Sequence, residues 1–189
     1  TTGGSAFRVR SGRQKTAEAN SEDLAATTRI KYTGIPGVQL AASVQYQKDP
    51  SQGSGDGLDS GLLYQAHVAV QRGRFGFRAL YAGWDFDIDE AIGLANGVAQ
   101  ATLDRAEDQN GWYVEPSWKV LETLGIYARY EDIEAAREQD NFDQWQVGLN
   151  YWPHESIVFK VDWRERTHDI ITSQGRDFSG FDLGVGYQF

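Results

Sequence analysis

The sequence contains no cysteine and no methionine, and only 4 of its 189 residues are proline. The absence of cysteine excludes disulfide bonds and thiolate metal sites. The absence of methionine, together with a start that has neither a charged nor an apolar leader region, predicts a mature form or a piece of a longer protein. No apolar run approaches the roughly 18 to 20 residues of a membrane-spanning helix, so insertion as helices is excluded.

Basic residues are also in deficit, with 18 Lys and Arg against 27 Asp and Glu and a net charge of −9. This balance repels a phosphate backbone, so no nucleic-acid partner is expected. The mean hydropathy of −0.53 is low, whereas the aromatic content of 13% is high. Aromatic residues favour strands and surfaces that pass from apolar to wet surroundings. The composition therefore favours a strand-rich protein.

Apolar and polar residues alternate through most of the sequence, most clearly in FDQWQVGLNYWPHESIVFKVDWRER at 142–166. A period of two residues predicts strands with one apolar and one polar face. The alternation and the turn signals together predict about ten strands, near residues 5–12, 25–33, 38–48, 61–72, 74–86, 111–119, 123–133, 142–152, 155–167 and 179–189. Most of them are close to the roughly 9 to 11 residues that cross a membrane.

The predicted connections alternate between short and long. Short turns are expected at 34–37, 72–74, 120–123 and 153–155, and long polar connections at 13–24, 49–60, 87–110, 134–141 and 168–178. A short helix is expected within the third long connection, around 89–106. Tight turns at one rim and extended loops at the other are typical of a membrane barrel.

The apolar face of these strands has no partner within the sequence, because no long amphipathic helix is present. Lipid can cover that face while water fills the interior, and closure of the sheet removes edges that lipid cannot satisfy. The expected fold class is therefore all-β, an antiparallel transmembrane β-barrel formed by residues 1–189 as a single domain. A soluble barrel or sandwich is the alternative, and it would need an apolar interior.

The strand register places ten basic residues on the inward face: Arg8, Arg10, Arg29, Lys31, Arg78, Lys119, Arg129, Lys160, Arg164 and Arg166. Four acids share that face, namely Glu115, Glu131, Asp162 and Asp182, while most other acids fall in the long connections. Two main interpretations stay open, besides a chance register. The basic residues form a pathway that concentrates anions, or they form ion pairs that brace the barrel, as the position of Asp162 between Lys160 and Arg164 suggests.

Other chemistry has little support in the sequence. The three histidines, His67, His154 and His168, have no metal-binding spacing, and no activated serine or second supporting pair accompanies His168 and Asp169 for catalysis. The acidic run DFDIDE at 85–90 matches no defined cation loop. No cofactor, metal ion or enzymatic activity is therefore expected.

Three segments, 109–134, 144–166 and 181–189, resemble the C-terminal half of the phosphate-selective porin O/P family of Gram-negative outer membranes. The strand GWYVEPS, the strand and turn VGLNYWPH and the terminal aromatics Tyr187 and Phe189 carry this resemblance, which extends from about residue 61 onward. It implies a sixteen-stranded barrel, a homo-trimer and conduction of phosphate or other anions. It also implies that Tyr187 and Phe189 form a C-terminal insertion signal.

The chain departs from that family because it offers about ten strands, so it is expected to be the C-terminal part of a sixteen-stranded porin. The early strands and the constriction loop would be missing, and no phosphate site is carried over. The expected function is passive diffusion of small solutes across the bacterial outer membrane, with a lean towards anions. The expected partners are outer-membrane lipid, small anions and further copies of the chain. The alternative is a non-conducting barrel that acts as an anchor or binds a partner through its acidic loops.

Overall fold

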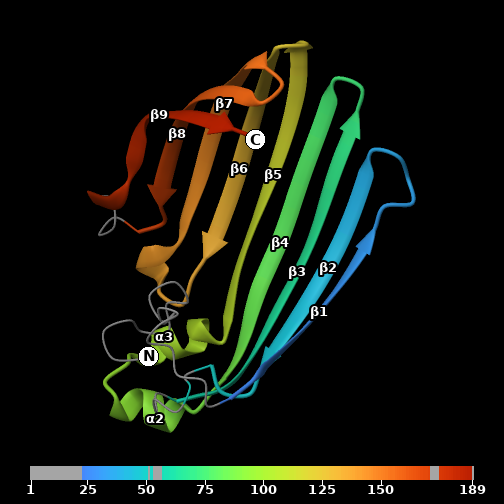
Figure 1. Ribbon diagram of the computed structural model, residues 1–189. Helices are drawn as coiled ribbons and strands as arrows, with labels where there is room; N and C mark the ends of the chain where they lie inside the picture. The colour runs from blue at the N-terminus through green and yellow to red at the C-terminus, as the bar shows by residue number, and fades with distance from the viewer. Residues whose placement is uncertain (1–22, 51, 53–56, 171–174, 189) are drawn as a thin grey trace.

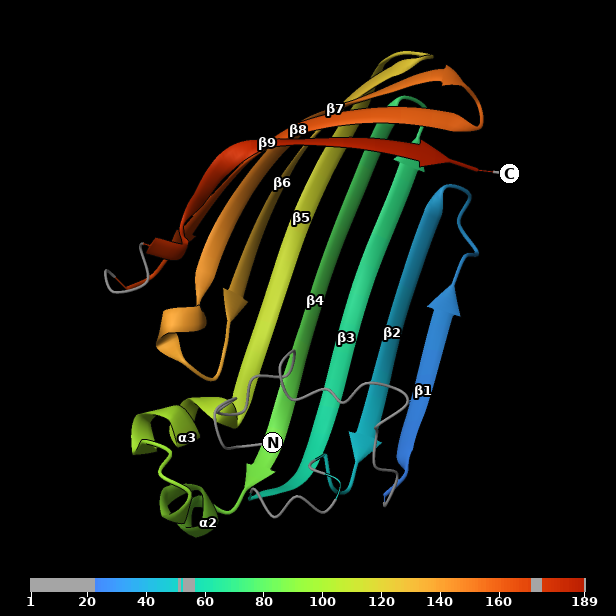
Figure 2. The same cartoon turned by 60° about the vertical axis from the view of Figure 1, so that its left-hand side comes forward.

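The computed structural model describes residues 23–50, 52, 57–170 and 175–188. Their strands are β1 (Ala25–Tyr32), β2 (Val38–Gln47), β3 (Leu58–Arg72), β4 (Phe75–Ile88), β5 (Asp108–Leu121), β6 (Leu124–Glu134), β7 (Phe142–His154), β8 (Ile157–His168) and β9 (Phe178–Tyr187). Each strand pairs antiparallel with the next, in one sheet of order β1 to β9. Figures 1 and 2 show the sheet as a curved wall with β1 and β9 at its two edges. The all-β fold is confirmed as a partial barrel.

Nine of the ten predicted strands correspond to β1–β9, and the tenth, at 5–12, lies outside the described residues. Several strands are longer than predicted. The prediction of β3 began at residue 61 and that of β5 at residue 111, whereas pairing starts at Leu58 and Asp108. The alternation fades at these ends, so the sequence alone did not reveal them.

The connections sort into two rims, as predicted. Short turns join β1 to β2, β3 to β4, β5 to β6 and β7 to β8 at one rim, where Gly37 and Gly73 adopt φ values of 77° and 57°. Long connections lie at the other rim, which Figure 2 shows at the bottom. The helix expected around 89–106 is two helices, α2 (Glu90–Ala95) and α3 (Gln100–Ala106). A 3-10 turn, η2 (Glu138–Asp140), lies between β6 and β7.

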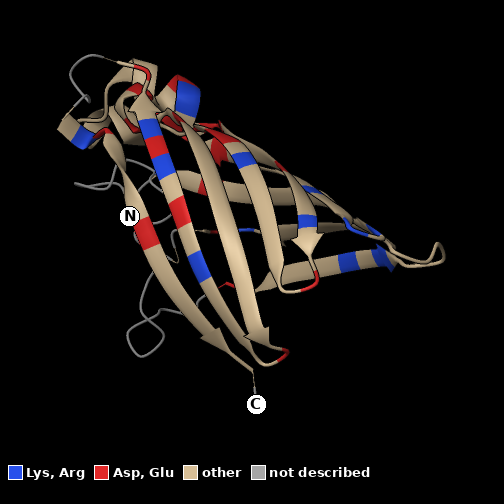
Figure 3. Cartoon of the chain, turned by 90° about the horizontal axis from the view of Figure 1, so that it is seen from above, with Lys and Arg blue, Asp and Glu red and all other residues tan. Residues whose placement is uncertain are grey.

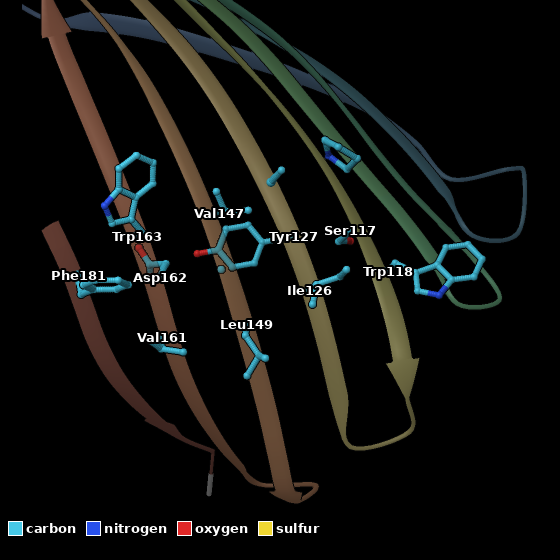
Figure 4. A pocket seen from close by; sticks show the side chains of 13 residues that line it. Ser117, Trp118, Ile126, Tyr127, Val147, Leu149, Val161, Asp162, Trp163 and Phe181 are labelled. Carbon is cyan, nitrogen blue, oxygen red and sulfur yellow. The ribbon is translucent and has the colours of Figure 1, made fainter. Parts of the chain in front are cut away.

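Apolar side chains cover the outer face of the wall. Large hydrophobic residues are exposed there on every strand except β3, for example Ile30, Val44, Tyr81, Trp118, Ile126, Val147, Phe159 and Leu183. A groove of about 530 Å³ lies on this face. Figure 4 shows the side chains that line it, which include Leu149, Val161 and Trp163. Exposed apolar surface over a whole sheet is the reverse of a soluble protein's pattern and fits contact with lipid.

Aromatic residues gather towards both ends of the outer face. Near the long connections, Trp112, Tyr130 and Trp145 form a chain with ring centroids 5.4 and 4.7 Å apart. Near the short turns, Phe75 pairs in register with Trp118, and further along the sheet Tyr151 pairs with Phe159. Two aromatic belts that flank an aliphatic band are typical of a membrane-spanning barrel.

The hydrophobic core of the described residues lies at the rim of long connections. Phe86 and Ile88 at the end of β4 pack with Leu103 and Ala106 of α3 and with Ala136. Phe86 and Ile88 lie in inward register, so the α2–α3 segment packs against the inner side of the wall at this rim. Neither α2 nor α3 is long and apolar enough to cross a membrane.

Candidate functional site

The candidate site is the concave inner face, where charged side chains from neighbouring strands meet. Figure 3 marks the charged positions along the strands in blue and red. Three polar residues of the inner face, Glu115, Gln144 and Asp162, are buried, with 8%, 4% and 4% of the whole residue exposed. Burial of ionised groups requires partners, so the contacts of these acids decide what the face can do.

Glu115 of β5 joins two arginines. Its Oε2 accepts hydrogen bonds from Arg129 Nη2 at 2.6 Å and from Arg129 Nε at 2.9 Å. Its Oε1 lies 3.5 Å from Nη1 of Arg78, which is its register partner on β4. Charge-assisted bonds of this kind are stronger than neutral ones and hold Arg129 in one place.

The contacts continue across β6, β7 and β8. Nη1 of Arg129 lies 4.0 Å from Oε2 of Glu131, whose Oε1 accepts a hydrogen bond from Gln144 Nε2 at 2.8 Å. Oε1 of Gln144 in turn accepts a hydrogen bond from Arg166 Nε at 3.0 Å. A chain of polar contacts therefore crosses the inner face from β4 to β8.

Asp162 and Asp182 hold the basic residues of β8. Nζ of Lys160 lies 3.3 Å from Oδ2 of Asp162, and Oδ1 of the same carboxylate accepts a hydrogen bond from Gln146. Arg164 pairs with Asp182 of β9. The network expected around Asp162 is present, except that Arg164 turns to the acid of the neighbouring strand.

In the ion pairs of Glu115 and Asp162, the cations are more exposed than the acids. Side chains of Arg78, Lys160 and Arg129 are 65%, 40% and 29% exposed, against 11% for Glu115 and 4% for Asp162. The Arg164–Asp182 pair is the reverse, because its acid is the more exposed partner. A solute that approaches Glu115 or Asp162 therefore meets positive charge first.

Five basic residues converge on one hollow of about 310 Å³ near the short turns. Arg74, Arg78, Lys119, Arg129 and Lys160 line it, and Glu115 is the one acid in the lining. Glu122, Glu131 and Asp162 border it through their ion pairs, so the five cations face four acids and leave a local charge of about +1. Lys119 makes no ion pair with any described residue, and its Nζ lies 5.6 Å from the centroid of the Trp152 ring.

Tyr127 is one of the residues that line the hollow, and it depends on a glycine. A Cβ at Gly148 would lie 2.2 Å from the ring of Tyr127, so glycine is required for the ring to lie across β7. Lys160 Nζ lies 4.9 Å from the centroid of the same ring. The cation is thereby held between an aromatic face and the carboxylate of Asp162.

The other predicted residues that the structure describes do not line the hollow. Arg8 and Arg10 lie outside the described residues, as does Phe189, and Tyr187 is exposed at the end of β9. Arg29 and Lys31 lie exposed on the edge strand β1. Arg166 lies towards the long connections.

Sequence reasoning missed Arg74 and Arg176. Arg74 lies in the tight turn before β4, where the predicted turn 72–74 and the predicted strand 74–86 overlap, and its Nη1 donates to the carbonyl oxygen of Val120 at 3.3 Å. Arg176 lies in the connection before β9, and its Nη1 lies 2.6 Å from Oδ1 of Asp140. The parity that Arg74 shares with Arg78 could have indicated it, whereas register carries no information about Arg176.

At the rim of long connections, Asp177 of the connection before β9 contacts His168 at the end of β8. Asp177 Oδ1 accepts a hydrogen bond at 2.9 Å from the backbone N–H of His168 and lies 2.9 Å from its Nδ1. These hydrogen bonds lower the pKa of Asp177 below its usual value because they stabilise the carboxylate. The contact ties the β8–β9 connection to the end of β8.

Comparison with known proteins supports the fold. No family model matches the chain, and no curated protein matches it. Among solved structures, a porin refined at 1.8 Å resolution matches with a TM-score of 0.59 and 13% identity, over 93% of this chain and 54% of that one. Two structures of OmpT, an outer-membrane protein of Vibrio cholerae, match with TM-scores of 0.56 and 0.57 and identities of 11% and 12%. They cover 87% and 90% of this chain, and 56% and 57% of theirs.

The protein therefore has the fold of an outer-membrane β-barrel of porin-like architecture. The chain spans about half the length of the structures that it matches. The similarity is to porin-like barrels in general and does not single out the phosphate-selective group.

Proposed function

We propose that this chain forms part of the wall of a porin in the bacterial outer membrane, through which small solutes diffuse with a preference for anions. The observation that carries the proposal is the asymmetry of the ion pairs that Glu115 and Asp162 form. Their acids are buried at the base, and the basic groups of Arg78, Arg129 and Lys160 lie nearer the solute. Positive groups on a wall that separates water from lipid concentrate anions at the surface.

Closure of the wall is part of the proposal. β1 and β9 both run from the rim of long connections to the rim of short turns. Direct pairing of these edges would be parallel, so an antiparallel closure needs an odd number of further strands. The nine strands of the described residues, in a chain about half the length of the matched ones, suggest seven more, which gives the sixteen that the family resemblance implies. A barrel of that size leaves an aqueous channel.

Several narrower features of the proposal rest on the resemblance to the phosphate-selective porin O/P family. They are phosphate as a preferred solute, a homo-trimer in the membrane and diffusion without enzymatic chemistry. The hollow near the short turns supports the preference for phosphate, because guanidinium and ammonium groups bind phosphate well. The trimer and the insertion signal at Tyr187 and Phe189 stay predictions.

The proposal is tested by single-channel recording of the full-length barrel in a planar bilayer with a salt gradient. The reversal potential is expected to show anion preference, and added phosphate is expected to reduce the chloride current. Lys119→Gln is expected to weaken both effects, because Lys119 is the lining cation without an ion pair among the described residues. Arg72→Gln removes the same charge in outward register on β3 and serves as the control. Cation preference of the wild type, or equal effects of both variants, would contradict the proposal.

A non-conducting anchor is the second candidate. It is favoured by the pairing of Arg78, Arg129, Lys160 and Arg164 with carboxylates, as expected for a braced wall. Absence of conductance from a correctly folded barrel would support this candidate over the porin.

A further inference from the structure

The inner face contains an apolar region that a charged diffusion pathway does not require. Leu63, Leu80 and Trp84 occupy inward register among glutamines and charged residues. The strand pairings place Leu63 opposite Trp84, and Leu80 opposite Tyr113 of β5. The apolar exceptions of three strands thus meet in one place, and a clustered apolar patch on a wet surface commonly marks a binding site.

These residues line a hollow of about 600 Å³ near the long connections. Ile133 and Phe142 lie opposite each other on β6 and β7 and complete its apolar lining. Trp84 is held firmly, because its ring stacks on Phe86 at a centroid distance of 5.0 Å and packs against the core of the α2–α3 segment. The volume lies within the range of about 300 to 1,000 Å³ usual for small-molecule sites.

One cation at this hollow lacks an acidic partner. No described carboxylate oxygen lies within 4.0 Å of the Arg166 guanidinium, whose Nε donates to Gln144 and whose carbon lies 4.0 Å from the centroid of the Phe142 ring. The other charged groups of the lining are engaged. Arg176 pairs with Asp140, and Glu131 contacts Gln144 and Arg129. The hollow therefore combines an aromatic and aliphatic surface with one positive group available to a ligand.

We propose that this hollow binds small carboxylates with an apolar or aromatic body, with the ring on Leu80, Trp84 and Tyr113 and the carboxylate on Arg166. This inference rests on the proposed function, since the solute would meet the site while it diffuses through the channel. The apolar surface favours the ring by removing it from water, and the guanidinium binds the carboxylate through paired N–H groups. A weak site suits a diffusion channel, because the solute must also leave.

The test uses benzoate as the probe and the full-length barrel folded in detergent. Binding is measured by saturation transfer from protein to benzoate in proton NMR. Benzoate is expected to bind at least tenfold more tightly than acetate, which lacks the ring, and than benzyl alcohol, which lacks the charge. Arg166→Gln is expected to weaken benzoate binding by about tenfold, since it removes a charged hydrogen-bond donor. Leu80→Gln is expected to weaken benzoate binding and to leave acetate unaffected.

Arg72→Gln, in outward register on β3, is the matched charge control, and heat-modifiable gel migration verifies the fold of each variant. Equal binding of benzoate and acetate, or an undiminished benzoate signal in both inner variants, would overturn the inference. The two proposals fail separately. Conductance without selective benzoate binding would contradict only the proposed carboxylate site. Selective binding that depends on Arg166, without conductance, would contradict only the proposed porin function.

Discussion

Glu115→Gln tests the central feature of the inner face. The substitution keeps the shape of the side chain and removes the charge that Arg78 and Arg129 share. It is expected to have two effects of opposite kind, since it weakens the wall and at the same time releases two guanidinium groups into the lumen. Measurement of both effects on one variant separates a bracing role from a conducting one.

The loss of stability follows from the geometry of the pair. Arg129 donates two hydrogen bonds to Oε2 of Glu115, at 2.6 and 2.9 Å, and the glutamate side chain is 11% exposed. Charged hydrogen bonds contribute about 1.5 to 3 kcal/mol each, and removal of one partner of a buried pair costs about 3 to 5 kcal/mol. Because glutamine still accepts one bond and Arg129 is partly exposed, we expect a loss of about 2 to 3 kcal/mol in unfolding free energy.

The gain in anion preference is smaller. One added positive charge about 8 Å from a permeating ion in water changes its energy by about 0.5 kcal/mol, or about twofold in relative permeability at low salt. Urea unfolding in lipid vesicles gives the first quantity, and the reversal potential in a salt gradient gives the second. Glu165→Gln, in outward register on β8, removes the same charge and is expected to change neither.

Two results would refute this reasoning. Unchanged stability would mean that Glu115 does not brace the arginines. A shift towards cation preference would mean that the face carrying Arg78 and Arg129 does not line the water-filled side.

Three further outcomes are expected. Val147→Arg places a charge in the outer apolar band and is expected to cost about 2 to 4 kcal/mol in urea unfolding from vesicles, whereas Gln146→Arg beside Asp162 is expected to cost less than about 1 kcal/mol. Leu103→Ala, at the 1% exposed centre of the rim core, is expected to lower the stability of that core by about 2 to 4 kcal/mol and to expose 89–107 to protease, with the sheet still folded. Because the pKa of Asp177 is lowered in the folded protein, its contribution to stability is present above pH about 4 and is lost as the pH falls through the folded pKa. Hydrogen exchange of the His168 amide is therefore expected to quicken below pH about 4 in the wild type. Asp177→Asn is expected to lose this pH dependence.

Much of the wall could be predicted from the sequence, because the alternation of side chains is a local property of the backbone. Residues such as Val147 and Gln146 take opposite faces in any strand, so the apolar outer band followed directly from their order. The sorting of connections by length indicated the two rims in the same way. The unpartnered apolar face indicated the membrane barrel. The family resemblance suggested a porin, and the structural comparisons support a porin-like fold.

The sequence by itself determined which residues face lipid and which face the interior, and it placed Glu115, Asp162 and the basic residues on one face. Only the tertiary structure decided which of them pair. It showed that Arg164 turns to Asp182, and that Lys119 and Arg166 lack an acidic partner among the described residues. It also showed that Leu80, Trp84 and Tyr113 meet in one hollow. The physical reason is that pairing depends on the register between strands far apart in the sequence and on the direction of long side chains. Neither is encoded in the local period of two residues.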